Sequence, residues 1–201
     1  MKIIVWNSQE KRIADYYKLM GGCDVLCLLG CGQWDVPQDA VRVQNKLFYW
    51  KEKGSRISYD VLYCSEQLAF VCREGLYSGE SIVYSVHSSI GSLVGICLQD
   101  NFWLFANHES NIINAYHIGE FYLREISDRF RKAAFIADFK EKSYSWALET
   151  VGTQYCVTPP EKLHPLTINY LFAIHVACSD QFLIEEYEDL PNQPTLFELE
   201  I

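Results

Sequence analysis

Between residues 60 and 107, five short apolar segments follow one another with only short polar pieces between them. Segments of this length, rich in Val, Ile, Phe and Tyr and closely spaced, predict an antiparallel β-meander. The compact polar turn at 99–101 (QDN) predicts that the last two segments form a hairpin. The segments are DVLYC, LAFVC, SIVYSV, LVGICL and FWLFAN, at 60–64, 68–72, 81–86, 93–98 and 102–107.

Strands and helices alternate on either side of this meander. Helical spacing of apolar residues predicts helices over 8–20 and 112–132, the second being the longest in the chain. At 201 residues and 49% hydrophobic content, the chain can bury one substantial core, so we expect a single domain over 1–190. Together these patterns predict a two-sheet α/β sandwich with helices outside. Further apolar runs that predict strands lie at 2–6, 23–29, 47–50, 133–139, 168–176 and 182–186.

The charge of the chain is strongly acidic, at a formal −9 with a pI of about 5.0. No bulk positive field is available to gather nucleic acid or anionic lipid, so nucleic acid is a disfavoured partner. Residues 185–201 hold six acids and no Lys or Arg, and Pro191 and Pro194 favour a loop. We therefore expect 191–201 to be an acidic C-terminal tail, either simply solvated or used to bind a partner.

The N-terminal sequence and the cysteines indicate the cellular compartment and the redox state of the protein. The apolar start is too short for a secretory signal, and no stretch has the length of a membrane span, so we expect a cytoplasmic protein. Non-classical export or a toxin or effector role stays open. Most of the eight cysteines sit in apolar runs, which favours reduced core thiols over disulfides. In the run CDVLCLLGCG at 23–32, cysteines four apart in a strand lie about 13 Å apart, too far to share one zinc ion.

Polar residues stand at four places where an apolar run stops. They are Asn7 after KIIVW, His108 after FWLFAN, Asp138 after AAFIA, and Asp180 in the segment CSDQ. Active sites of layered α/β folds gather at strand ends. These four residues are therefore the candidate catalytic residues.

The segments around these four residues resemble those of a known protein family. In their order along nearly the whole chain, the segments VWN, CDVLCLLGCG, VGICLQDNFWLFANHES, FIADFKE and CSDQ resemble the endonuclease/exonuclease/phosphatase superfamily, in the version carried by the B subunit of cytolethal distending toxin. The resemblance implies a deoxyribonuclease-I-like, four-layer α/β/β/α sandwich of two mostly antiparallel sheets. It also implies, in active relatives, metal-assisted hydrolysis of phosphoesters. Asn7, His108, Asp138 and Asp180 match catalytic positions of the family.

Other positions depart from the family's pattern. Gly30 stands where the family has its metal-binding Glu, Gln181 where it has the His of its SDH motif, and Lys140 where it has the Asn of its GDFN motif. A further family acid falls near Leu171, or on Asn169 if the register is shifted. Without a carboxylate at residue 30, Mg²⁺ lacks a fixed oxygen ligand, and a glutamine cannot exchange a proton near neutral pH.

These departures predict a catalytically impaired, toxin-B-subunit-like protein that acts by binding an unknown protein partner and uses no cofactor. The alternative is an active nuclease or phosphoinositide phosphatase that uses Mg²⁺ in a rearranged site, with His108, Asp138 and Asp180 and with Glu109 as a displaced ligand. In a related hypothesis, the Lys140 ammonium lies near Asp138 and replaces part of the metal's charge. A third reading, an unrelated scaffold, requires that the strand order fail to bring the four candidate residues to one edge.

Overall fold

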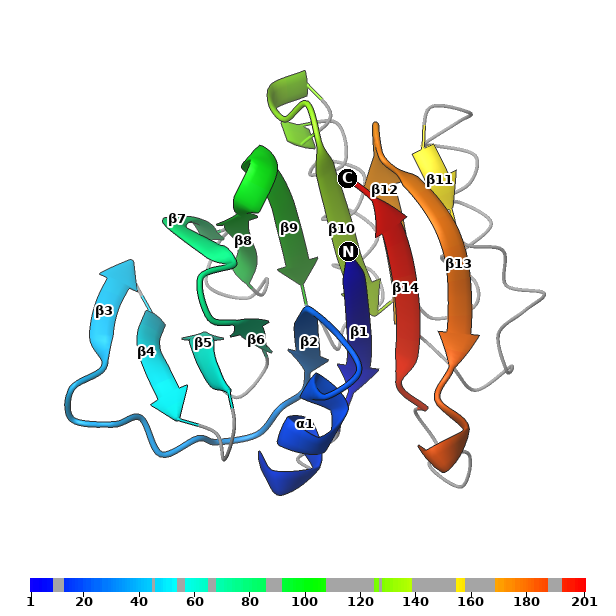
Figure 1. The fold of residues 1–201 in the computed structure, drawn as a ribbon. Coiled ribbons are helices and arrows are strands. Elements are labelled where there is room, and N and C mark those ends of the chain that lie inside the picture. Colours follow the sequence, from blue (N-terminus) through cyan, green and yellow to red (C-terminus); the bar gives the residue numbers. More distant parts are fainter. Residues whose placement is uncertain are drawn as a thin grey trace.

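The computed structural model of the chain describes residues 1–8, 13–44, 46–53, 57–64, 68–85, 92–107, 125–126, 128–138, 155–157, 169–187 and 193–201. These residues form two mixed β-sheets, with one helix, α1 (Ile13–Met20), following the first strand (Figure 1). We call the eight-stranded sheet, in the order β13-β14-β1-β2-β6-β5-β4-β3, sheet A, and the six-stranded sheet, in the order β11-β12-β10-β9-β8-β7, sheet B.

Sheet A is built from both ends of the chain and part of its middle. One pair of neighbours, β1 and β2, is parallel, and the other neighbours are antiparallel. Its strands are β1 (Lys2–Asn7), β2 (Val25–Leu29), β3 (Val41–Gln44), β4 (Leu47–Lys53), β5 (Ser58–Cys64), β6 (Leu68–Arg73), β13 (Ala177–Leu183) and β14 (Thr195–Glu200).

Sheet B also contains one parallel pair, β9 with β10. A short 3₁₀ turn over Gln99–Asn101 joins β8 to β9, and a second, Glu185–Tyr187, follows β13. The strands of sheet B are β7 (Tyr77–Ser85), β8 (Ser92–Leu98), β9 (Phe102–Asn107), β10 (Ala133–Asp138), β11 (Tyr155–Val157) and β12 (Asn169–Ile174).

The alternation of side chains along β1 shows how the layers are filled. Ile3 and Val5 belong to a buried cluster that also takes in apolar residues of β8, β9, β10 and β12, so this cluster lies between the two sheets. Ile4 and Trp6 belong to a second cluster with Tyr16 of α1. Because successive side chains of a strand point to opposite faces, α1 covers the outer face of sheet A while sheet B covers its inner face.

The five predicted strands are confirmed as β5 to β9, and the hairpin of β8 and β9 is antiparallel as expected, but the five strands do not form one meander. Its turn holds Asp100 and Asn101 at positive φ, which Asp and Asn tolerate better than most residues. One feature differs from a simple meander, because β5 and β6 belong to sheet A whereas β7, β8 and β9 belong to sheet B. The strands predicted at 2–6, 23–29, 47–50, 133–139 and 168–176 are present as β1, β2, β4, β10 and β12.

The C-terminal residues are not the solvated tail that their charge and prolines predicted. Thr195–Glu200 forms β14, which lies between β1 and β13 inside sheet A. Phe197 and Leu199 are buried, while Glu198 and Glu200 point the other way. The tail prediction is therefore wrong for these residues, because two acids on the outer face of a strand leave its inner face free to enter the core.

Other expectations are settled only in part. Seven cysteines are described, and all are free thiols, six of them buried, which confirms the expectation of reduced core thiols for these seven. Most of the predicted helix over 112–132 lies outside the described residues, although residues 125, 126, 128 and 129 are helical. Among the residues that the structure describes, no helix has the length and apolar character needed to cross a bilayer.

Candidate active site

The strand directions bring three of the predicted strand ends to one edge of the sandwich. β1 ends at Asn7 beside the end of β2, and β9 ends at Asn107 beside β10, which ends at Asp138. The arrowheads of β1, β2, β9 and β10 all point to the same side of the molecule in Figure 1. We call this the carboxyl edge. The next residue after Asn107 is His108, whose own placement lies outside the described residues.

Asn7 is buried, and the chain just beyond it is fixed to the end of β2. The Ser8 amide donates to the Leu29 carbonyl oxygen at 2.9 Å, and the Ser8 hydroxyl donates to the Gly30 carbonyl oxygen at 3.3 Å. Asn7 itself is 6% exposed. The ends of β1 and β2 therefore form one rigid corner, with a backbone amide and a hydroxyl in place of any charged group.

The segment that follows β2 is held by aromatic side chains. The Tyr16 hydroxyl lies 3.0 Å from Ser8 Oγ and 3.3 Å from the Cys31 carbonyl oxygen, and the Trp34 indole N–H donates to that same carbonyl at 3.4 Å. The Trp34 ring is stacked between Tyr16 and Tyr63, with ring centroids 5.7 and 5.9 Å away. We call Tyr16, Trp34 and Tyr63 the aromatic stack. It fixes the loop that, by the family resemblance, would carry a metal ligand.

Gly30 opens that loop in a left-handed conformation, with φ 59°. Glycine adopts this conformation without steric cost, whereas a residue with a Cβ pays for it. By the family resemblance, Gly30 stands where active relatives have a metal-binding glutamate. The backbone now gives a second reason why a larger side chain at residue 30 is disfavoured.

On sheet B, the register sets Asp138 opposite Asn169. Leu171 lies opposite Ile136 and is 1% exposed in the core between the sheets. Of the two positions that the sequence offered for the family's further acid, Asn169 is therefore the one at the carboxyl edge. Lys140 lies outside the described residues, so the proposed contact between Lys140 and Asp138 stays a hypothesis.

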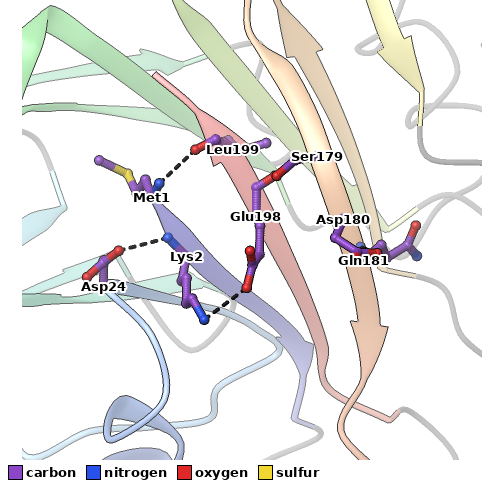
Figure 2. A network of polar contacts seen from close by, with 8 residues as sticks. All are labelled: Met1, Lys2, Asp24, Ser179, Asp180, Gln181, Glu198 and Leu199. Carbon is purple, nitrogen blue, oxygen red and sulfur yellow. Dashed lines mark hydrogen bonds and ion pairs between the residues drawn. The ribbon is translucent and has the colours of Figure 1, made fainter.

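Asp180 does not join the other candidates. It lies within β13 rather than at a strand end, and it is paired through β14 with Glu198, which is itself level with Lys2 at the start of β1. Asp180 Oδ1 accepts a hydrogen bond from the Gln181 amide at 2.7 Å (Figure 2). Lys2 and Asn7 stand at opposite ends of β1, about 16 Å apart at the usual rise per residue. The expectation that Asp180 stands at the same edge as Asn7 is therefore wrong.

The strand that approaches the carboxyl edge beside β1 is β14, which the sequence analysis had treated as tail. Its first residue, Thr195, is level with Val5 and fully buried, and its hydroxyl has no hydrogen-bond partner among the described residues. Two residues earlier, Gln193 is 8% exposed and donates from Nε2 to the Ile184 carbonyl oxygen at 3.0 Å. Continuing the register of β1 and β14 brings Gln193 level with Asn7. The alternation in TLFELE after Pro194 was the signal that could have located these residues.

The described side chains of the carboxyl edge do not fit a magnesium site. They are the amides of Asn7, Asn107 and Gln193 and the hydroxyls of Ser8 and Thr195. Magnesium sites in proteins normally use at least one carboxylate oxygen. Within the described parts of the chain, no three His, Cys, Asp or Glu side chains come together as they would around a metal ion.

Comparisons with known proteins bear on the fold. No family model and no curated protein matches the sequence. By structure, D. rerio TDP2 in complex with a single-strand DNA product has a TM-score of 0.63 at 10% identity, over 100% of this chain and 99% of that one. A 3′-5′ exonuclease, NExo from Neisseria meningitidis, has 0.59 at 13% identity over 100% of both chains. An endonuclease/exonuclease/phosphatase family protein from Bacteroides thetaiotaomicron has 0.55 at 10% identity, over 99% and 97%.

The chain has the deoxyribonuclease-I-like fold. This confirms the predicted α/β sandwich, with the likeness extending over the full length of this chain and of these neighbours. Identities of 10–13% establish architecture and not activity, because one fold hosts many functions. Kinship with the toxin B subunit and the loss of hydrolysis stay predictions.

Proposed function

We propose that this protein is a catalytically impaired member of the endonuclease/exonuclease/phosphatase superfamily, related to the toxin B subunit, that acts by binding another protein. The fold supports the superfamily. Gly30 supports the impairment, because by the family resemblance hydrolysis would need a metal-binding carboxylate at that position.

The single observation that carries the proposal is Gly30. It stands at the end of β2 with a left-handed backbone, its carbonyl oxygen accepts from Ser8, and its loop is held by the aromatic stack. No rotation of an existing side chain could bring a carboxylate to residue 30, since glycine has no side chain.

The experiment is calorimetric titration of Mg²⁺ and of Mn²⁺ into the purified protein, with plasmid nicking and phosphate release from phosphoinositides measured on the same sample. We expect neither saturable metal binding nor turnover. Metal-dependent cleavage of either substrate that copurifies with the protein through every chromatographic step would overturn the proposal.

A second candidate function is an active phosphoester hydrolase, and one observation favours it. The ends of β1, β9 and β10, at Asn7, Asn107 and Asp138, reach the same edge, and His108 follows Asn107 in the sequence. The solved neighbours of this fold include an exonuclease and a TDP2 bound to a DNA product, so nucleic acid is the first substrate to try.

His108→Ala separates the two candidates. In an active hydrolase this change removes the group that would handle the proton, and general acid–base groups typically contribute about 10²–10⁴-fold in rate. In an impaired protein it leaves the background rate unchanged. Asp180→Asn is the matched control, because Asp180 lies at the other end of sheet A and its loss should leave turnover alone in both cases.

A further inference from the structure

Two polar side chains of sheet A are buried without a hydrogen-bond partner among the described residues. Gln181 of β13 is 7% exposed, and neither its Nε2 nor its Oε1 atom has such a partner. Thr195, at the start of β14, is fully buried, and its hydroxyl is in the same position. Burying a polar group without a partner lowers stability, and proteins often give up stability in this way where they bind something.

Both side chains point into the space between the two sheets. Gln181 lies opposite Phe197 and Thr195 lies opposite Val5, and these two apolar residues belong to the buried cluster between the sheets. Residues directly opposite each other in an antiparallel pair point to the same face. Gln181 and Thr195, which we call the amide–hydroxyl pair, are therefore diagonal neighbours on the inner face of sheet A. Diagonal neighbours usually lie about 7–8 Å apart, so one small polar group can contact both.

A β-bulge turns Gln181 to this face. The register of β13 against β14 shifts between Cys178 and Asp180, so Ser179 is an extra residue in β13. Cys178 packs against the cluster between the sheets, and simple alternation counted from it would point Gln181 outward. The Asp180 carboxylate holds the bulged backbone, because its Oδ1 accepts a hydrogen bond from the Gln181 amide at 2.7 Å. Bulges re-aim side chains and are frequent beside functional sites.

The inner face around the amide–hydroxyl pair is apolar. Asp180 lies opposite Glu198, and both of these side chains belong to the outer face. On the inner face of β14, Phe197 and Leu199 are buried. A charged ligand would lose its water here without gaining a countercharge, whereas a neutral polar ligand loses less. Because a glutamine amide both donates and accepts, the matching ligand is neutral and offers an acceptor beside a donor.

We propose that Gln181 and Thr195 form a binding site for the carboxamide or lactam group of a small neutral ligand. Gln181 Nε2 would donate to the carbonyl oxygen of the ligand, Oε1 would accept from its N–H, and the Thr195 hydroxyl would supply a further hydrogen bond. β13 is the last strand on its side of sheet A, so this site lies beside the lateral edge of the sheet and not at its centre. It is independent of the proposed protein binding.

The first test is the stability of the protein without ligand. Gln181→Leu and Thr195→Val keep the approximate shape and remove an unpaired polar group, so each should raise the midpoint of urea denaturation. The matched control is Gln193→Leu, because Gln193 donates to the Ile184 carbonyl oxygen at 3.0 Å, and its loss should lower the midpoint. Permanently bound water is the other way to satisfy the pair. In that case Gln181→Leu would also lower the midpoint, and the inference would be overturned.

The second test measures binding to the full chain with three probes of similar size, benzamide, benzoate and acetophenone. Saturable shifts of the Gln181 side-chain amide in nitrogen–proton correlation NMR spectra report binding, and this signal is identified by its loss in Gln181→Leu. We expect benzamide to bind at least about tenfold more tightly than benzoate, which brings a charge, and than acetophenone, which has no N–H for Oε1. No saturable shift with benzamide, or equal affinities for the three probes, would refute the site.

Two variants locate the contact. Thr195→Val should weaken benzamide by about threefold to tenfold, as expected for one lost hydrogen bond. Phe182→Ser is the control, because Phe182 is 45% exposed and lies opposite Leu196 on the outer face, and it should leave the affinity unchanged. An equal loss in Phe182→Ser would contradict the placement. Neither result depends on metal binding or turnover, so failure of this inference leaves the proposed function unaffected.

Discussion

The two ends of β1 are unlike in their chemistry. At its start, the Lys2 amine pairs with Glu198 at 2.9 Å, the Lys2 amide donates to Asp24 at 2.8 Å, and the amino group of Met1 donates to the Leu199 carbonyl oxygen at 2.7 Å (Figure 2). At its finish, Ser8 donates to two backbone carbonyl oxygens and contacts Tyr16 of the aromatic stack. The start of β1 is therefore held by charged groups, whereas its finish is held by neutral ones.

The two ends of β1 are therefore expected to contribute unequally to the stability of the fold. Exposed ion pairs contribute little to stability, since solvent screens them, whereas buried rings contribute through packing. The carboxyl edge is therefore the end of β1 that contributes more to stability.

The largest expected effect comes from removing the centre of the aromatic stack. Trp34 is 5% exposed between Tyr16 and Tyr63, so Trp34→Ala should lower the free energy of unfolding by about 3–5 kcal/mol. Urea denaturation followed by circular dichroism measures it. Lys2→Met at the other end of β1 is the control and should shift the midpoint far less. Comparable shifts for the two variants would mean that the ends of β1 do not differ as described.

A substitution at Gly30 tests the carboxyl edge more directly. Gly30→Glu and Gly30→Gln should each lower the free energy of unfolding by about 1–2 kcal/mol, because both place a Cβ at positive φ. Only the Glu variant adds a carboxylate, so only it should gain affinity for Mg²⁺ in calorimetry. If the Gln variant binds Mg²⁺ equally well, the missing carboxylate is not what limits metal binding at this edge.

A smaller effect is expected from the hydroxyl that joins α1 to this edge. Tyr16→Phe removes contacts to Ser8 Oγ and to the Cys31 carbonyl oxygen but keeps the ring in the stack. A buried hydrogen bond of this kind contributes about 0.5–1.5 kcal/mol. The same urea denaturation detects the change, and Tyr17→Phe serves as the control because Tyr17 makes neither contact. A loss as large as that of Trp34→Ala would show that the hydroxyl, and not the stack, holds the loop.

Much of the fold follows from local sequence pattern. The strands β5 to β9 were predicted because each is a short apolar run bounded by polar residues, and packing then preserved them. The division of these strands between two sheets was not predictable in this way, since periodicity within a segment carries no information about which sheet the segment joins. That choice is made by long-range contacts between β1, β2 and β6, and between β9 and β10.

The predictions for Asp180 and for residues 195–200 were wrong for the same reason. Short motif matching assigned Asp180 to an edge that it does not reach, and charge counting assigned 195–200 to a tail. In both cases the deciding fact is which strand lies next to β1, and that strand is β14. The period-two pattern of Phe197 and Leu199 was visible in the sequence, but the two glutamates between and after them outweighed it.

The smallest expected effect is a pH dependence at the start of β1. The hydrogen bond to Glu198, followed by the charge of Glu198, raises the pKa of the Lys2 amine above its usual 10.5. Because the folded pKa is raised, the pair's contribution to stability is fully present below the unfolded pKa and is lost as the pH rises through the folded pKa. The small difference in unfolding free energy between the parent and Lys2→Met should therefore be constant near neutral pH and vanish in strongly alkaline buffer.

The two ends of β1 should also respond differently to ionic strength. Added salt screens an exposed pair such as Lys2 with Glu198, whose side chains are 51% and 33% exposed, but it does not screen the packing of the aromatic stack. In denaturation at low and high salt, the effect of Lys2→Met should shrink while that of Trp34→Ala persists. A salt-independent effect of Lys2→Met would mean that Lys2 acts through the packing of its aliphatic chain, and the contrast between the two ends of β1 would then be one of degree only.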